Sequence, residues 1–167
     1  MNALFVGRFQ PFHNGHLMVL QRLSTEYAVV IIGIGSSQYS GTQENPFSAE
    51  EREQMIGESL HAEGIENYRI VQIPDIHDPP HWVAHVCTIV SDFDVVVSNN
   101  PLTQQLFSEK GYRVVGTPVY KRKSFSGKEI RRRIIHGEPW QDLVPPSVVR
   151  LINQRDGVER IKKVSSS

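Results

Sequence analysis

The sequence has one cysteine, Cys87, and no excess of charge of either sign. A single thiol excludes an internal disulfide and a zinc site built from several cysteines, and it suits a reducing compartment. The 18 Lys and Arg residues balance the 18 Asp and Glu residues, so the formal net charge is zero. Without a bulk positive field the chain lacks a general attraction to nucleic acids, and any site for anions must be local.

Long apolar runs are also missing. No stretch approaches the ~20 apolar residues that a membrane-spanning helix needs, and the residues before Gly7 lack the basic start and the length of a secretory signal. We therefore expect a cytoplasmic protein that contacts neither membrane nor nucleic acid. Hydrophobic residues make up 39% of the chain and charged residues 22%, which is typical of a globular domain with a buried core.

Short β-branched runs alternate with longer amphipathic segments. Five runs are mostly continuous apolar stretches rather than alternating ones, as in strands buried on both faces, at residues 3–6, 27–34, 69–73, 95–98 and 113–115. Helical patterns occupy residues 15–24, 48–63, 81–90, 101–110, 126–136 and 146–155. This order predicts an α/β fold: a doubly wound, Rossmann-like five-stranded parallel sheet with helices on both faces and a small C-terminal helical region.

The length predicts a single domain over residues 1–167. We expect a Rossmann-like core at 1–120, a helical part at 121–163 and a frayed tail at 164–167. Within the core, Ser48 and Glu51 have the spacing of a capping box, and Gly64 follows that helix as a C-terminal cap.

A group of unusual polar residues directly follows the first predicted strand. In a doubly wound sheet, phosphate groups bind at this place, beside the start of a helix. Gly7 and Gly15 would let backbone and phosphate approach closely. His13 and His16 are three residues apart, so they share one face of the helix start. Either histidine alone is more simply explained as a helix cap or as packing against the sheet. The pair, with Gly15 between, favours a polyphosphate site.

Residues 126–133 form a second basic cluster, Ser-Gly-Lys-Glu-Ile-Arg-Arg-Arg. Ser126 has the place of an N-cap, the amides of the first turn would point at an anion, and Arg131 lies one turn further on. The alternative is a solvated basic helix face, which we keep for at least one of the three arginines. The basic run at 121–123 either steers polyphosphate or solubilises a loop, and both remain open.

Four ordered blocks carry a resemblance to a known family. Residues 13–16, His-Asn-Gly-His, look like the His-x-Gly-His signature of the nucleotidylyltransferase superfamily. The longer string at 7–16 resembles the archaeal nicotinamide-nucleotide adenylyltransferase family, and further similarity occurs at 45–52, 98–102 and 125–133. Four blocks in order, spread from about residue 3 to residue 163, are not explained by chance.

The resemblance implies transfer of the adenylyl group of ATP to nicotinamide mononucleotide (NMN), which gives NAD and pyrophosphate. It also implies Mg²⁺ held mainly through the ATP phosphates, with no protein metal site, and a homo-oligomer, for which a hexamer is one form. Three alternatives stay open. One is an adenylyltransferase of the same fold for phosphopantetheine or flavin mononucleotide (FMN), and another is a nucleotide sensor without catalysis. The third and weakest is a tRNA-binding synthetase fragment, against which the neutral net charge and the short chain argue.

Residue roles follow from the two basic clusters and from the resemblance together. The residues expected to act in catalysis are Arg8, His13, His16 and Arg131. The residues expected to bind ATP are these four together with Gly7, Gly15, Asn99, Asn100, Ser126 and Gly127. The residues expected to bind NMN are Phe9, Gln10, Ser36 and Trp82.

Several of these assignments have simpler alternatives. Trp82 would otherwise pack its helix against the sheet, and Asn99 and Asn100 would otherwise form a strand-to-helix turn with a cap. The sequence also departs from the resembled family. Gly127 and Lys128 replace residues that sometimes supply hydroxyl contacts. At Glu44 and Pro79 many relatives carry an Arg and an Asn nearby, so contacts to the mononucleotide differ there.

Overall fold

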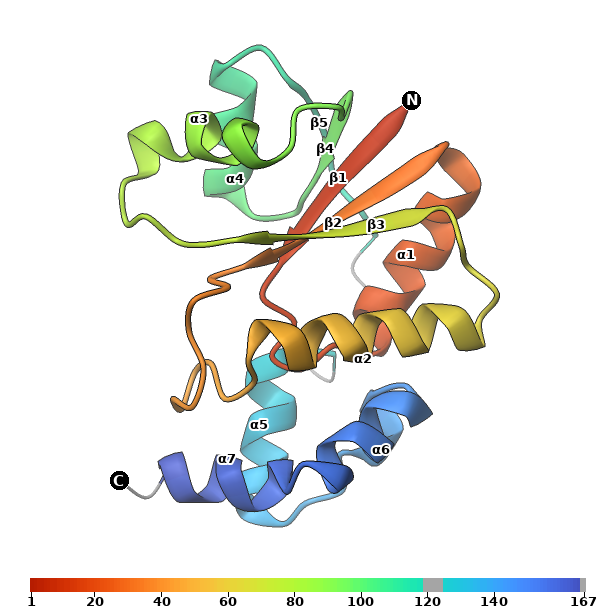
Figure 1. Cartoon of the computed structure of the whole chain (residues 1–167), viewed down its shortest axis with the longest axis vertical. Helices are drawn as coiled ribbons and strands as arrows, with labels where there is room; N and C mark the ends of the chain where they lie inside the picture. The colour runs from red at the N-terminus through yellow and green to blue at the C-terminus, as the bar shows by residue number, and fades with distance from the viewer. Residues whose placement is uncertain (119–124, 166–167) are drawn as a thin grey trace. The chain divides into compact units, whose positions relative to one another are not determined.

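Five parallel strands form one sheet in the order β3-β2-β1-β4-β5 (Figure 1). The computed structural model describes residues 1–118 and 125–165. The strands are β1 (Asn2–Gly7), β2 (Val29–Gly35), β3 (Tyr68–Ile73), β4 (Val95–Val97) and β5 (Arg113–Val115). The predicted α/β class with a five-stranded parallel sheet is confirmed. The strand order reverses between β1 and β4, so the exit of β1 lies at the switch point, where ligands bind in such sheets.

Helices follow each of the first four strands and continue to the end of the described chain. They are α1 (Asn14–Glu26), α2 (Ala49–Ala62), α3 (Pro79–Ile89), α4 (Pro101–Glu109), α5 (Gly127–His136), the short 3₁₀ helix η1 (Gln141–Leu143), α6 (Pro146–Gln154) and α7 (Gly157–Ser165). Helix α7 is not among the helical segments predicted from the sequence. Val158, Ile161 and Val164 recur at helical spacing, which is the signal that marks it.

The described chain forms two compact units that do not follow chain order. The sheet unit comprises Met1–Gly7, Val19–Ser37 and Asn67–Pro118. The helical unit comprises Arg8–Met18, Gln38–Glu66 and Val119–Ser167. The first unit therefore holds all five strands with α3, α4 and the second half of α1. A single domain with a boundary at residue 120 stays a prediction.

The sheet unit has an apolar core between strands and helices. Leu4 pairs in register with Ile31 on one side and Val96 on the other, and all three side chains are fully buried. Val86 of α3 and Phe107 of α4 pack onto this cluster. Since parallel crossovers are right-handed and the strand order reverses at β1, α1 covers one face of the sheet and α3 and α4 cover the other. Strands β2 and β4 are buried along nearly their whole length, as their apolar runs predict, whereas β3 and β5 at the two edges of the sheet keep exposed side chains.

The helical unit confirms the predicted signals at the two ends of α2. The Ser48 hydroxyl accepts a hydrogen bond from the Glu51 N–H at 3.1 Å, and the Glu51 carboxylate accepts one from the Ser48 N–H at 3.0 Å. Gly64 follows the helix in the left-handed region, with φ +70°. Helix α2 packs against α6, and α5 packs against α7.

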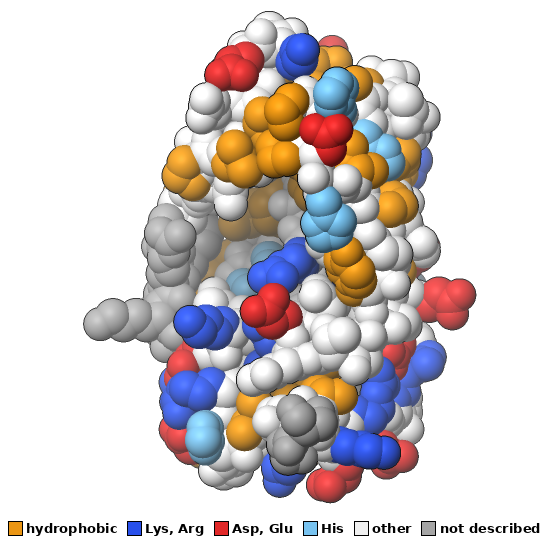
Figure 2. Space-filling view, turned by 90° about the vertical axis from the view of Figure 1, so that its left-hand side faces the viewer, with side chains coloured by type: hydrophobic (Ala, Val, Ile, Leu, Met, Phe, Trp, Pro, Cys, Tyr) orange, Lys and Arg blue, Asp and Glu red, His pale blue; other side chains and the backbone are white. Residues whose placement is uncertain are grey.

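Charges of both signs are interspersed on the surface drawn in Figure 2, in agreement with the zero net charge. Among the helices in residues 1–118 and 125–165, none has the length and apolar character needed to cross a membrane.

Candidate phosphate-binding site

The loop that leaves β1 enters the helical unit at Arg8 and turns sharply at Phe9. Phe9 has φ +54°, in the left-handed region that costs a residue with a side chain on the order of 1–3 kcal/mol. Its ring is buried, and its centroid lies 4.7 Å from that of the His16 ring in an edge-on arrangement. The ring of Phe12 stacks on the same imidazole, with the centroids 5.6 Å apart. The loop therefore packs around His16.

His13 and His16 cap the start of α1 reciprocally. The Nδ1 atom of His13 accepts hydrogen bonds from the N–H groups of Gly15 (3.1 Å) and His16 (3.3 Å). The Nδ1 atom of His16 accepts one from the N–H of His13 at 3.1 Å. The two rings stack with their centroids 3.5 Å apart. This arrangement has the logic of a capping box, with imidazoles in place of a hydroxyl and a carboxylate.

The cap fixes the proton on each ring. A neutral imidazole whose Nδ1 accepts a hydrogen bond carries its proton on Nε2. Burial lowers the pKa of His13 from 6.5 to about 4. Burial, followed by the neighbouring His13, lowers the pKa of His16 well below 6.5. Both rings are therefore neutral near pH 7, and each offers one Nε2–H donor. The capping role is thus present for both histidines, and binding of polyphosphate by the pair stays a prediction.

Gly15 is required by the His13 ring. A Cβ at this position would lie 2.9 Å from His13 Cε1, 3.0 Å from His13 Nδ1 and 3.0 Å from Phe125 Cβ. The expectation was that Gly15 lets a phosphate approach the backbone. In the structure, the absence of a side chain at Gly15 leaves room for the His13 imidazole, and the Gly15 N–H donates a hydrogen bond to that ring. A contact between Gly15 and ATP stays a prediction.

Arg131 of α5 reaches the same loop. Its Nη1 atom donates a hydrogen bond to the carbonyl oxygen of Gln10 at 2.6 Å. A Cβ on Gly127 would lie 2.8 Å from that Nη1 atom and 2.9 Å from that carbonyl oxygen. Glycine at 127, a departure from the resembled motif, therefore makes room for this contact. Ser126 is the N-cap as predicted, since its hydroxyl accepts from the Glu129 N–H at 3.1 Å. The two basic clusters, far apart in sequence, meet at Gln10.

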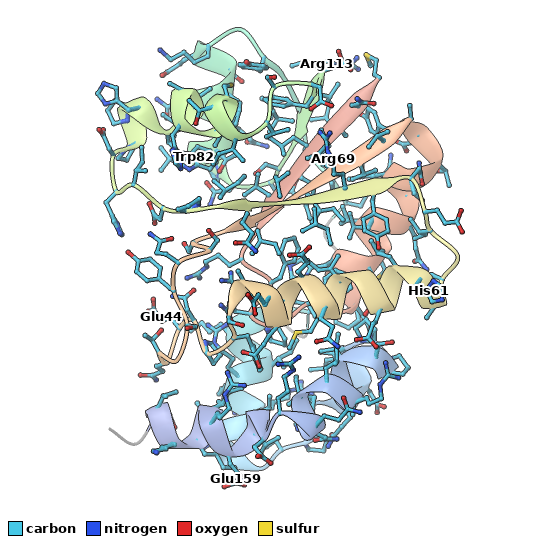
Figure 3. The ribbon with its side chains drawn as sticks, viewed as in Figure 1. Glu44, His61, Arg69, Trp82, Arg113 and Glu159 are labelled. Carbon is cyan, nitrogen blue, oxygen red and sulfur yellow. The ribbon has the colours of Figure 1, made fainter. Side chains whose placement is uncertain are left out.

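Positive charges gather around the loop. Burial lowers the pKa of Arg131, the charge of Arg8 lowers it further, and the charge of Glu44 opposes this. Burial also lowers the pKa of Arg52 to about 10, again with a contribution from Arg8. Figure 3 shows Glu44 on the segment that precedes α2. Arg8 is thus close enough to lower the pKa of both Arg52 and Arg131, and a polyanion bound beside Arg8 and Arg131 would offset this repulsion.

Gln10 serves as a brace within the protein. Its side-chain amide donates to the Phe47 carbonyl at 2.9 Å, and its side-chain oxygen accepts from the Phe47 N–H at 2.9 Å. Arg160 of α7 supports the same segment: it donates to the Pro46 carbonyl at 2.9 Å and forms a two-pronged ion pair with Glu51 at 2.6 and 2.9 Å. The expected contacts of Phe9 and Gln10 with a mononucleotide stay predictions, and the structure gives both residues packing or bracing partners.

The remaining expected site residues belong to the sheet unit. Gly7 ends β1 in register with Ile34, and Ser36 follows β2 with φ +48°. Asn100 caps α4 by accepting from the Thr103 N–H at 3.1 Å.

Asn99 and Trp82 also have partners within the sheet unit. The Asn99 amide bridges to Thr117, donating to its carbonyl at 3.0 Å and accepting from its N–H at 2.8 Å. Trp82 projects from α3 (Figure 3), and its ring meets Phe107 edge-on at 5.5 Å between centroids. The structural alternatives weighed for Trp82 and Asn100 are thus present, and their nucleotide contacts stay predictions.

Two further expectations concern a protein metal site and the basic run at 121–123. In the part of the chain that the structure describes, no three His, Cys, Asp or Glu side chains are grouped so that they could hold a metal ion. The basic run at 121–123 lies outside the described residues.

Sequence reasoning missed the residues that brace the loop from a distance, Arg52 and Arg160 above all. A signal for Arg52 was available. It shares a helix face with Met55, Ile56 and Ser59, which are buried like it, and this spacing marks a buried position. Nothing local in the sequence connects Arg160 with Glu51, because the two are 109 residues apart.

A doubly wound sheet whose first strand leads into paired imidazoles and clustered guanidinium groups defines a nucleotide-binding α/β protein. The model of the family described as Cytidylyltransferase-like matches residues 4–133, and the chain belongs to this family.

Relatives with established names are similar over nearly their whole length. The nicotinamide-nucleotide adenylyltransferase of Picrophilus torridus is 48% identical over 167 residues, which cover 100% of this chain and 99% of that protein. The protein of the same name from Thermoplasma acidophilum is 46% identical over 165 residues, which cover 99% of this chain and 92% of that one. The resemblance inferred from the four sequence blocks is thereby confirmed.

A solved structure shares the fold. A bifunctional NMN adenylyltransferase/ADP ribose pyrophosphatase from Francisella tularensis, complexed with AMP and an Mn ion, has a TM-score of 0.79 to this chain at 24% identity. The match covers 97% of this chain and 52% of that one, so this chain spans about half the length of the two-activity protein.

Proposed function

We propose that the protein transfers the adenylyl group of ATP to nicotinamide mononucleotide, forming NAD and pyrophosphate. The observation that carries the proposal is the reciprocal cap of His13 and His16, which leaves two neutral Nε2–H donors on a loop that Arg131 also holds. The relatives from Picrophilus torridus and Thermoplasma acidophilum are named for this activity, and their similarity extends over 100% and 99% of this chain.

The chemistry requires no nucleophile from the protein. An oxygen of the mononucleotide 5′-phosphate attacks the α-phosphorus of ATP in line and forms the new P–O bond. The bond between the α-phosphorus and the bridging oxygen to the β-phosphate breaks, and pyrophosphate leaves with that electron pair. The acceptor phosphate is already anionic near neutral pH. The protein therefore contributes alignment and stabilisation of charge.

Neutral and charged donors would divide this work. His16 and His13 would donate Nε2–H to oxygens of the α-phosphate region, where charge redistributes during transfer. A neutral imidazole in this position keeps its orientation through its cap and does not exchange a proton with the substrate. Arg8 and Arg131, together with the first turn of α5, would hold the outgoing β- and γ-phosphates, on which negative charge increases.

The donor set fits Mg²⁺ bound to ATP. The loop supplies N–H donors and guanidinium groups, and these bind phosphate oxygens rather than metal. An ion that keeps several waters and is held mostly by phosphate oxygens suits such a site. When bound, Mg²⁺ would neutralise phosphate charge.

For the acceptor, we assign Trp82 of the sheet unit to stacking on the nicotinamide ring. Its edge-on contact with Phe107 fixes the indole plane, which is a condition for a stacking platform. Ser36, Phe9 and Gln10 are assigned to the surroundings of the mononucleotide, and Asn99 and Asn100 to the ATP phosphates or ribose.

The test is a parallel assay with ATP and one of three acceptors, NMN, phosphopantetheine or FMN, scored by release of pyrophosphate. We expect release with NMN and formation of NAD in equal amount. Release with phosphopantetheine or FMN alone would place the protein in another branch of the same fold. ATP binding without release for any acceptor would support a nucleotide sensor and refute the proposal.

A further inference from the structure

A buried guanidinium that the proposed reaction does not use stands behind the phosphate loop. Arg52 of α2 is 0% exposed, the largest of the fully buried side chains. We propose that Arg52 is a positioning residue: it holds the backbone of Arg8, and its contribution to triphosphate binding passes through Arg8. This inference rests on the proposed function, because it concerns the same site.

The contacts of Arg52 join three segments of the helical unit. Its Nε atom donates to the Ser48 carbonyl at 3.2 Å, and one Nη atom donates to the Tyr39 carbonyl at 3.3 Å. The other Nη atom donates to the Arg8 carbonyl at 2.9 Å, across 44 residues of sequence. A guanidinium offers several donors in a rigid plane, whereas a lysine ammonium is a compact point charge on a flexible stem. Only arginine therefore connects these carbonyls at once.

Arg52 holds the loop directly before Phe9, the residue at which the backbone turns sharply. Phe9 is left-handed, and the carbonyls on its two sides are both held by arginines from distant segments: Arg52 holds that of Arg8, and Arg131 holds that of Gln10 at 2.6 Å. A strained residue persists only where its surroundings over-determine it. We infer that these two contacts form a clamp across Phe9, which fixes the direction in which the Arg8 side chain leaves the loop.

The charge of Arg52 is retained under burial. The nearest acidic neighbour on its helix, Glu51, is itself held by two hydrogen bonds from Arg160. The charge of Glu51 opposes the lowering of the Arg52 pKa, and Arg52 donates hydrogen bonds to the backbone carbonyls of Ser48, Arg8 and Tyr39. Burial of a charge costs desolvation free energy that an apolar side chain of similar size avoids. We infer that the fixed backbone of the loop is what the arginine contributes in exchange.

The test is a double-mutant cycle between Arg52→Lys and Arg8→Ala, read by calorimetric titration with MgATP. Lysine keeps the charge and removes the planar fork. We expect Arg52→Lys to weaken MgATP binding about tenfold in the natural background, as for the loss of a hydrogen bond to a charged group. In the Arg8→Ala background it should change binding less than twofold, because the residue through which it acts is gone. The KM for NMN should change less than twofold.

The matched control is Arg150→Lys, which alters an exposed ion pair to Glu58 of the same helix α2 and should leave MgATP binding unchanged. Folding of each variant is checked by circular dichroism, with Arg52→Gln as a second substitution. Three results would overturn the proposal, because in each of them Arg52 does not act through Arg8. They are equal weakening of MgATP binding in both Arg8 backgrounds, an MgATP affinity that Arg52→Lys leaves unchanged, and failure of both Arg52 variants to fold. The titration needs no acceptor, so an absence of adenylyl transfer in the natural protein would refute the proposed function separately.

Discussion

Replacement of His16 separates the two tasks that the structure gives this ring. Its Nδ1 atom accepts from the His13 N–H at 3.1 Å, and its Nε2–H is the donor that we assign to phosphate. An asparagine oxygen can take the place of Nδ1 but cannot extend to Nε2, whereas a glutamine amide can take the place of Nε2 but leaves Nδ1 unreplaced. The pair His16→Asn and His16→Gln is therefore matched in chemistry and differs in reach.

The two substitutions should rank in opposite orders for activity and for stability: His16→Gln should be the more active variant and His16→Asn the more stable one. Loss of one oxyanion donor costs ~2.7–4 kcal/mol in the transition state, so kcat of His16→Asn should fall by about 10²–10³. Loss of a helix cap costs about 1 kcal/mol, so the free energy of unfolding should be lower for His16→Gln than for His16→Asn by that amount. Both variants lose ring contacts with Phe9, Phe12 and His13, and that shared loss cancels in the comparison.

The assays are steady-state release of pyrophosphate with NMN as acceptor and unfolding in urea at the same pH. We expect kcat in the order natural protein, His16→Gln, His16→Asn, and the reverse order of the two variants in stability. If His16→Asn turned over within a few-fold of the natural protein, or if both variants lost the same activity, the assigned donor role would be wrong.

Three further predictions address the pH dependence, the second basic cluster and the acceptor. The pKa of His13 is lowered on folding from 6.5 to about 4, so the unfolded chain binds more protons between these values and stability must fall as pH falls through this window, by about 3 kcal/mol in total for this ring. His13→Asn keeps a capping oxygen and should flatten that part of the pH profile of the free energy of unfolding in urea; an unchanged profile would contradict the lowered pKa of His13. Gly127→Ala places a methyl group 2.8 Å from Arg131 Nη1 and should therefore separate Arg131 from Gln10. We expect the fold to be destabilised by about 1–3 kcal/mol and the KM for ATP to rise. An unchanged KM for ATP would contradict the shared anion site. Trp82→Ala should weaken NMN binding by about 1–3 kcal/mol and change ATP binding little. The measurement is the KM for each of the two substrates in the pyrophosphate-release assay, and an unchanged KM for NMN would contradict the stacking role.

Periodicity and local chemistry were sufficient for much of the architecture. The five strands were predictable because each is a mostly apolar run between turns, with polar residues only at Arg69, Gln72 and Arg113 besides the ends of the strands. The two ends of α2 were predictable because Ser48 with Glu51 at the start and Gly64 at the finish are local signals. The closeness of His13 and His16 followed for the same reason, since a separation of three residues at a helix start leaves little choice of geometry.

What could not be predicted depends on contacts between distant residues. The sequence offers Gln10 as a polar residue in a binding loop, but Phe47 occupies both ends of its amide. From the sequence, Gly127 is only a departure from a motif. The folded chain gives the reason for it, because a Cβ at this position would meet Arg131 and Gln10. Arg160 is one charged residue on an amphipathic helix, and only the folded chain shows that Glu51 and Pro46 are its partners. Local spacing contains no record of such pairings.

The ion pair of Arg160 has a consequence for any attempt to shorten the protein. The matched family segment ends at residue 133, so the last helix lies beyond it and would be an obvious part to delete. Yet that helix supports the segment that contains Phe47, and the Phe47 backbone holds the side chain of Gln10, whose own carbonyl accepts from Arg131. Trimming the carboxyl end would therefore act at the opposite end of the polypeptide, by loosening the loop on which phosphate recognition depends.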